Sequence, residues 1–163
     1  MKNDFLDFLK NNIVFLISMI FFFILFSLKY FLKVQNLWLL LFFILGGLIS
    51  LFLLWLDQNF LLTFYQNQEL NPTINNFLFV LVLPILLVLL LTSKSTLGFS
   101  VGFNLYLFLM IKMIVLLKDP FLFNRFFSQQ LSKNFNRLEI NLIFGFYFIA
   151  FLFINILFWQ FNF

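Results

Sequence analysis

Long apolar stretches separated by short polar segments divide the chain into five parts. A helix rises about 1.5 Å per residue, so about 20 residues cross the hydrocarbon core of a bilayer. The stretches do not alternate apolar and polar residues, as the strands of a membrane β-barrel do. The pattern therefore predicts an all-α fold: a polytopic transmembrane helical bundle of about five spans in one integral membrane domain, 1-163. The expected spans cover about 13-32, 37-56, 77-92, 97-117 and 141-159.

Two of these stretches carry further local signals. The connection at 33-36 is tight, so we expect the first two spans to form an antiparallel hairpin. The third stretch is short and holds Pro84 at its centre. In a membrane a neighbouring helix can satisfy the carbonyl that the proline frees, so we expect a kinked helix here instead of a break.

The largest polar segment, about 119-138, mixes cations with large apolar side chains. Such a mixture is typical of a segment that lies in the membrane interface, with Arg125, Lys133 and Arg137 as its interfacial cations. Asp119-Pro120 favours the start of a helix, because proline suits the first helical position.

The distribution of Lys and Arg predicts the orientation. With five spans, the side that holds the N-terminus carries six of these residues and the opposite side carries three. Lys112 is counted on neither side, because it lies inside the fourth span. Because cationic loops stay on the cytoplasmic side, the N-terminus is expected on the cytoplasmic or matrix side.

Composition agrees with a membrane protein and excludes several kinds of chemistry. The chain is 64% hydrophobic and 10% charged, against about 45–50% and about 25% in soluble domains. It has no Cys and no His, which excludes thiolate metal sites, disulfides and His-ligated haem. No catalytic motif stands out, so we expect no catalytic residues, no cofactor and no metal. The net charge of +4 fits attraction to anionic headgroups and no nucleic acid partner.

Phe contributes 31 of the 163 residues, whereas one Ala, two Arg, five Gly and three Pro are present. Because the scarce types have GC-rich codons, this bias indicates an AT-rich genome. On that interpretation the Phe residues fill interchangeable positions that face lipid, where Phe is favourable by a few tenths of a kcal/mol.

The candidate helix-packing residues lie in the second and fourth spans. Gly98 and Gly102 are four residues apart, so they share a helix face on which another backbone can approach closely. Lys112 falls within about 40° of the same direction. Two interpretations of Lys112 stay open: its side chain reaches the headgroups, or it pairs with Asp57 at the same membrane side.

Other polar and small residues favour structural roles. Gly46 and Gly47 are expected to ease helix packing, and Asn104 and Asn155 can bond across helices. The TSKST sequence at 92-96 is expected to be a solvated turn instead of a Ser/Lys dyad.

The stretches LTSKSTLGFSVGFNLYLFLM (91-110) and LKDPFLFNRFFSQQLSKNFNRLEINLIFGFYFIAFLF (117-153) carry a resemblance. They resemble small, functionally uncharacterised multi-span membrane proteins of candidate phyla radiation bacteria. LWLDQNF (54-60) corresponds there to the Asp-containing end of a span. Some of those proteins are similar to membrane-bound metal-dependent hydrolases, which depend on His and Asp. This chain has no His. The resemblance therefore implies a membrane location and no activity.

These observations favour a non-enzymatic structural or accessory protein of a bacterial plasma membrane that acts through helix packing. Its expected partners are the lipid bilayer and a membrane protein or a second copy of the chain. One alternative is an organelle-encoded accessory subunit of a respiratory-chain complex in the mitochondrial inner membrane. Another alternative is a small transporter.

Overall fold

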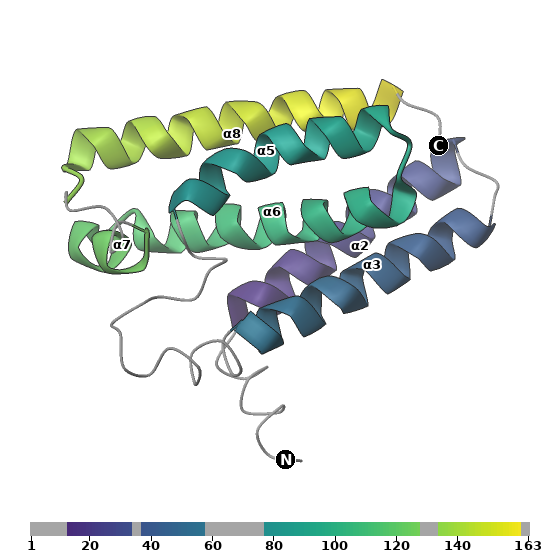
Figure 1. Ribbon diagram of the computed structural model, residues 1–163, viewed down its shortest axis with the longest axis horizontal. Helices are drawn as coiled ribbons and strands as arrows, with labels where there is room; N and C mark the ends of the chain where they lie inside the picture. Colours follow the sequence, from purple (N-terminus) through teal and green to yellow (C-terminus); the bar gives the residue numbers. More distant parts are fainter. Residues whose placement is uncertain (1–12, 34–36, 58–76, 128–133, 161–163) are drawn as a thin grey trace, which may run out of the picture.

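The computed structural model describes residues 13–33, 37–57, 77–127 and 134–160. Within these ranges the protein has six helices and no strand, which confirms the predicted all-α class (Figure 1). The helices are α2 (Ile13–Lys33), α3 (Leu37–Leu56), α5 (Phe77–Thr92), α6 (Thr96–Leu116), α7 (Pro120–Phe127) and α8 (Arg137–Gln160).

The five long helices lie along one common direction and alternate in polarity (Figure 1). Helix α6 occupies the middle, with α2 and α3 on one side and α5 and α8 on the other. Helices α2 and α3 pack side by side in opposite directions, as expected of a hairpin. Because α3 and α6 run the same way, their C-terminal ends lie at the same end of the bundle.

Two of the described helices, α6 with 21 residues and α8 with 24, are long and apolar enough to cross a membrane. Helix α5 and the segment Leu40–Leu56 are apolar but shorter. Helix α5 continues through Pro84, which is buried. Its 16 residues correspond to about 24 Å, so it is the shortest of the long helices. Length and apolarity alone also fit the core helices of a soluble protein.

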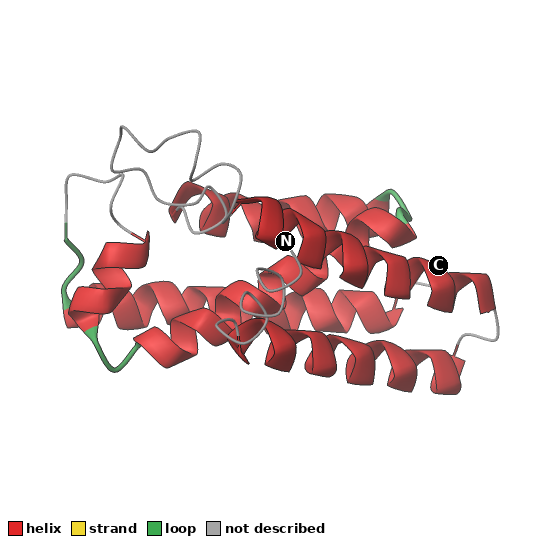
Figure 2. Ribbon diagram, turned by 90° about the horizontal axis from the view of Figure 1, so that it is seen from below, coloured by secondary structure: helices red, strands yellow, loops and turns green. Residues whose placement is uncertain are grey.

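Helix α7 lies across the end of the bundle, roughly crosswise to the long helices (Figure 2). It starts where the sequence predicts, because Oδ1 of Asp119 accepts hydrogen bonds from the N–H groups of Phe121 and Leu122 at 3.0 and 3.2 Å. Pro120 is its first residue. The expected interfacial segment therefore contains a helix over 120–127 and a non-helical stretch over 134–136, while 128–133 lies outside the described residues.

Helix α6 is surrounded by its neighbours and buried over most of its length. It contacts α2, α3, α5 and α8, so nearly every direction around its axis meets another helix. A helix that packs on all sides needs no polar face. Its central run from Gly102 to Met110 is buried without interruption.

The interpretation of Phe as lipid-facing filler is wrong for part of the set. Eight described Phe side chains are at most 2% exposed, because they fill the spaces between neighbouring helices. They are Phe22, Phe43, Phe99, Phe103, Phe108, Phe123, Phe127 and Phe158. Others, such as Phe52, Phe146 and Phe153, are more than half exposed and fit the original interpretation.

Candidate functional site

Helices α3 and α6 approach closely at Gly46. A Cβ atom on Gly46 would lie 2.7 Å from Cβ of Ser100 and 3.1 Å from the main-chain N of Val101. The absence of a side chain is therefore what allows this backbone approach. The next residue, Gly47, faces α2 instead, where Met19 and Phe22 are at 3.4 Å from its would-be Cβ.

Gly98 and Gly102 face a different helix, α5. A Cβ on Gly102 would lie 3.0 Å from Cδ2 of Leu87, and one on Gly98 would lie 3.0 Å from Cδ2 of Leu90. Both neighbours from α5 are the ends of flexible side chains, so this contact is less restrictive than the one at Gly46. The helix face that carries Gly98 and Gly102 thus contacts leucine side chains of α5.

A cluster of polar side chains lies where α2, α3 and α6 meet. The amide Nδ2 of Asn104 donates to Oγ of Ser50 on α3 and to Sδ of Met19 on α2, the latter at 2.9 Å. Ser50 in turn donates to the carbonyl of Gly47 at 2.7 Å. The expectation that Asn104 bonds across helices is confirmed. Oδ1 of Asn104 is buried and has no hydrogen-bond partner among the described residues.

Ser100 adds a polar link between α6 and α3. Its Oγ lies 2.9 Å from the carbonyl of Leu97 in its own helix and 3.3 Å from the carbonyl of Phe42 in α3. Asn155 behaves differently from the expectation: its amide donates to the carbonyl of Phe151, four residues earlier in α8, at 2.8 Å. An amide on a partly exposed helix face reaches its own backbone more easily than a neighbouring helix.

The opposite side of α6 packs on α8 through aromatic rings. Phe99 stacks on Phe103 and on Phe158, with ring centroids 5.3 and 5.2 Å apart. Phe103 also stacks on Phe151 at 6.0 Å. Together with Tyr106 and Tyr147, these rings form an aromatic column between α6 and α8.

The aromatic column ends at a pair of stacked tyrosines. The rings of Tyr106 and Tyr147 lie 4.1 Å apart with an interplanar angle of 16°. The hydroxyl of Tyr106 donates to the main-chain carbonyl of Tyr147. The hydroxyl of Tyr147 is buried with no hydrogen-bond partner among the described residues. Because a carbonyl oxygen has two lone pairs, this bond joins α6 to α8 without breaking a helical one.

Lys112 and Asp57 come together at the α7 end of the bundle. Asp57 follows α3 and is 3% exposed, whereas Lys112, near the end of α6, is partly buried. The two side chains interact electrostatically. The ammonium of Lys112 also lies 5.7 Å from the centre of the Phe108 ring, one turn earlier. Lys112 therefore has both an anionic and an aromatic neighbour inside the protein.

The corner between α7 and α8 is fixed by side chains that bond to backbone. The side-chain amide of Asn124 on α7 donates to the carbonyl of Phe135 at 2.9 Å and accepts from its N–H at 2.8 Å. Asn136 and Glu139 form a reciprocal capping box, with bonds of 2.8 and 2.9 Å. This cap explains why α8 begins at Arg137, before the expected fifth span of about 141-159.

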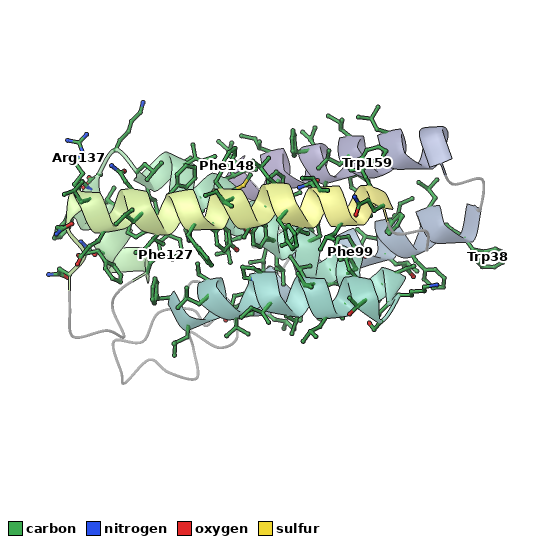
Figure 3. All side chains as sticks on the ribbon, turned by 90° about the horizontal axis from the view of Figure 1, so that it is seen from above. Trp38, Phe99, Phe127, Arg137, Phe148 and Trp159 are labelled. Atoms are coloured by element: carbon green, nitrogen blue, oxygen red, sulfur yellow. The ribbon has the colours of Figure 1, made fainter. Side chains whose placement is uncertain are left out.

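The expected interfacial cations are placed at this corner as far as the structure describes them. Arg125 and Arg137 are exposed, and Arg137 points away from the bundle (Figure 3). Lys133 lies outside the described residues. At the opposite end, Lys94 is exposed in the turn between α5 and α6 with a positive φ of 54°. Ser93 donates back to the carbonyl of Leu90, which agrees with a solvated turn.

Several packing residues were missed by sequence reasoning. Ser50 and Ser100 lie in long apolar runs and look incidental there, although small polar residues in a span are typical of helix contacts. The spacing of Phe99, Phe103 and Tyr106 by four and three residues was a usable signal for one helix face. The Asn136–Glu139 capping box was also readable from the sequence.

Comparison with protein-family models, with curated proteins and with solved structures gives no match for this chain. Among the residues that the structure describes, no group of three or more His, Cys, Asp or Glu side chains could hold a metal ion. The described residues thus form three kinds of contact between helices. Small and polar residues join α6 to α3, the aromatic column joins α6 to α8, and Lys112 and Asp57 lie at the α7 end.

Proposed function

We propose that the protein is an integral membrane protein that acts as a non-catalytic structural or accessory component through helix packing. In this proposal α2, α3, α5, α6 and α8 all cross the bilayer, and α7 lies in its interface. The role is that of a rigid bundle that offers apolar outer faces to lipid and to a membrane-protein partner or a second copy of the chain.

The observation that carries the proposal is where apolar and polar side chains lie. Along the middle of α2, α3, α5 and α8 the exposed side chains are apolar, whereas Ser18, Ser50, Ser100 and Asn104 are buried inside. Apolar exposure on this scale is unfavourable in water but suits hydrocarbon. The exposed set includes Ile17, Ile24, Leu45, Phe52, Ile85, Leu89, Phe146, Ile149 and Ile156.

The positions of the tryptophans support the same arrangement. Trp38 and Trp159 lie toward one end of the bundle (Figure 3), and Trp55 lies near the C-terminal end of α3, at the other. Indole rings favour the two membrane–water interfaces, where one part of the ring is apolar and the other is wet. A bundle that crosses a membrane would place these rings at opposite interfaces.

The short helix α5 is compatible with a span. A bilayer thins locally around a short apolar helix at a cost of fractions of a kcal/mol per Å. Helix α5 also packs on both α6 and α8, so only part of its surface meets lipid. We therefore include it among the five spans.

Membrane insertion and orientation are tested with single-cysteine variants, because the natural chain has no Cys. Lys94→Cys and Arg137→Cys lie at opposite ends of the bundle, and Ile149→Cys lies at an exposed position inside α8. We expect an impermeant maleimide to label Lys94→Cys from outside, to label Arg137→Cys only in inverted membranes, and to leave Ile149→Cys unlabelled.

Two results would contradict these assignments separately. Labelling of Ile149→Cys as fast as Lys94→Cys in intact membranes would show that α8 does not cross the bilayer. Labelling of Arg137→Cys from outside would reverse the orientation and leave the spans intact.

The accessory role is tested by isolating the protein in a mild detergent and identifying its partners by mass spectrometry. We expect a stoichiometric membrane-protein partner or a second copy, lost when exposed apolar residues of one helix face are changed. A stable monomer that carries no partner and moves a solute in proteoliposomes would contradict the accessory role and favour a transporter.

A further inference from the structure

Helices on opposite sides of the bundle differ in length. Helices α3 and α5 lie on opposite sides of α6 (Figure 1). Helix α3 has 20 residues, which correspond to about 30 Å, and α5 has 16, which correspond to about 24 Å. The hydrocarbon core of a typical bilayer is about 30 Å thick. Helix α3 matches this thickness, whereas α5 is about 6 Å too short for it.

The exposed apolar side chains of α5 also cover a short length of the helix. They run from Leu78, which is 59% exposed, to Leu89, which is 62% exposed, whereas those of α3 run from Trp38 to Leu53. At about 1.5 Å per residue these two lengths are about 17 Å and about 23 Å. The exposed apolar residues of α5, called the α5 face below, are Leu78, Leu81, Val82, Ile85, Leu86 and Leu89.

Exposed polar groups end the α5 face in the turn toward α6. Thr92, Ser93 and Lys94 are all exposed. Each of the two hydroxyls donates to a carbonyl three residues earlier in α5, at 2.9 and 3.1 Å. An ammonium group is costly inside hydrocarbon, so in an inserted protein this turn lies at the level of the headgroups.

The other end of α5 meets the corner between α7 and α8. The ring of Phe77, the first residue of α5, lies 5.2 Å from the ring of Phe135, measured between centroids. The side chain of Asn124 holds both backbone groups of Phe135, and Asn134 and Asn136 on either side of it are exposed. Polar groups therefore lie at both ends of α5, and a bilayer of ordinary thickness would immerse some of them.

We propose that the α5 face binds phospholipids with short acyl chains. Short chains form a thinner hydrocarbon layer, which covers the α5 face and leaves the polar groups at both of its ends in the headgroup region. Long chains must compress beside α5, and each ångström of mismatch has an energetic cost. The inference rests on the proposed insertion in a membrane and adds the chain length of the lipid that this face selects.

The test measures which lipid lies against each side of the same protein. Ile85→Cys on α5 and Leu45→Cys on α3, at positions 64% and 46% exposed, each carry one fluorescent label, because the natural chain has no Cys. The vesicles contain equal amounts of short-chain dimyristoleoyl and long-chain dierucoyl phosphatidylcholine, and one or the other is brominated so that it quenches the label. We expect the ratio of short-chain to long-chain quenching to be at least about twofold higher at Ile85→Cys than at Leu45→Cys.

Lengthening the α5 face should remove the preference. Adding Thr92→Leu and Ser93→Leu to labelled Ile85→Cys extends the face by about 6 Å, and the quenching ratio should fall to that of Leu45→Cys. Gln160→Leu is the matched control, because it adds an apolar side chain at an exposed position at the end of the 24-residue α8 and should leave the ratio unchanged. An unchanged ratio in the lengthened variant would overturn the short face as the cause.

The same measurements distinguish this proposal from the proposed insertion. Strong quenching at both positions with equal ratios would overturn the short-chain preference and leave the insertion intact. Quenching at Leu45→Cys with none at Ile85→Cys would show that protein covers α5 and would overturn lipid as its occupant. The absence of quenching at both positions would overturn the insertion itself.

Discussion

The two sides of α6 are held by different physical means. Toward α3 the contact is small and polar, with Gly46 against Ser100 and Asn104 bonded to Ser50. Toward α8 the contact is the aromatic column, in which large rings stack and one tyrosine hydroxyl meets a backbone carbonyl. The first contact depends on close backbone approach, and the second depends on filling a wide gap.

In the proposed membrane-spanning arrangement, this difference shows how one helix can be held among apolar neighbours in an apolar solvent. Lipid tails are as apolar as leucine, so exclusion from water does not drive helices together within hydrocarbon. Association must then come from dispersion between closely fitting surfaces and from hydrogen bonds. Glycine and serine provide the contact of α6 with α3, and aromatic stacking provides the contact of α6 with α8.

The largest effect should follow loss of a ring from the aromatic column. Phe103→Ala is expected to reduce the free energy of unfolding in detergent by about 3 kcal/mol, since a buried ring leaves a cavity between α6 and α8. Phe153→Ala is the control, because Phe153 is 54% exposed on α8. A similar loss in both variants would show that the column does not hold α8 to α6.

The contact between α3 and α6 should be sensitive to one methyl group. Gly46→Ala is expected to lower stability by about 1–3 kcal/mol, because its Cβ would overlap Ser100. Gly145→Ala has no atom within 4 Å of the added Cβ and should gain up to about 1 kcal/mol from helix propensity. Thermal melting in one detergent measures both, and an unchanged Gly46→Ala would mean that the two backbones are further apart.

Removing the charge of Lys112 tests the end of the α3–α6 contact. Lys112→Leu leaves the buried Asp57 without its cationic neighbour, and we expect a loss of about 1–2 kcal/mol, less than the 3–5 kcal/mol of a fully buried pair. Lys112→Arg keeps the charge and should retain most of the stability. If the Lys112→Leu variant has the same melting temperature as the unsubstituted protein, the Lys112 ammonium interacts with the lipid headgroups and not with Asp57.

The smallest effect should come from the amide bond inside the polar cluster. Asn104→Leu is expected to cost about 1 kcal/mol, because bonds between helices in membranes average about 0.6 and reach about 1.7 kcal/mol. Asn155→Leu should cost less, since that amide bonds within its own helix. Equal losses would indicate that the bonds of Asn104 to α2 and α3 contribute little.

The sequence predicted the helices better than it predicted their partners. The apolar runs at 37-56 and 77-92 match α3 and α5 at both ends, because polar and turn residues end them sharply. Helix α8 begins before the expected span of about 141-159, because its polar first turn is set by a capping box. The role of Asn104 was predictable, since an amide in an apolar run needs a partner.

The helix that packs against each glycine could not be predicted from the sequence. Their spacing indicated a packing face at Gly98 and Gly102, but it could not tell which helix covers that face. The backbone approach occurs instead at Gly46, where the sequence offers only a glycine pair in a long leucine-rich run. Periodicity gives directions around one helix axis and carries no information about the position of the next axis.

The sequence by itself determined the helical class and the apolar character of the long helices, because hydropathy and the period of apolar residues are local properties of the chain. It also determined the start of α7, since Asp119 and Pro120 act within one turn. Only the tertiary structure decided which Phe rings are buried and which face outward. Both kinds lie in equally apolar runs, and a ring becomes part of the core only when another helix lies against it.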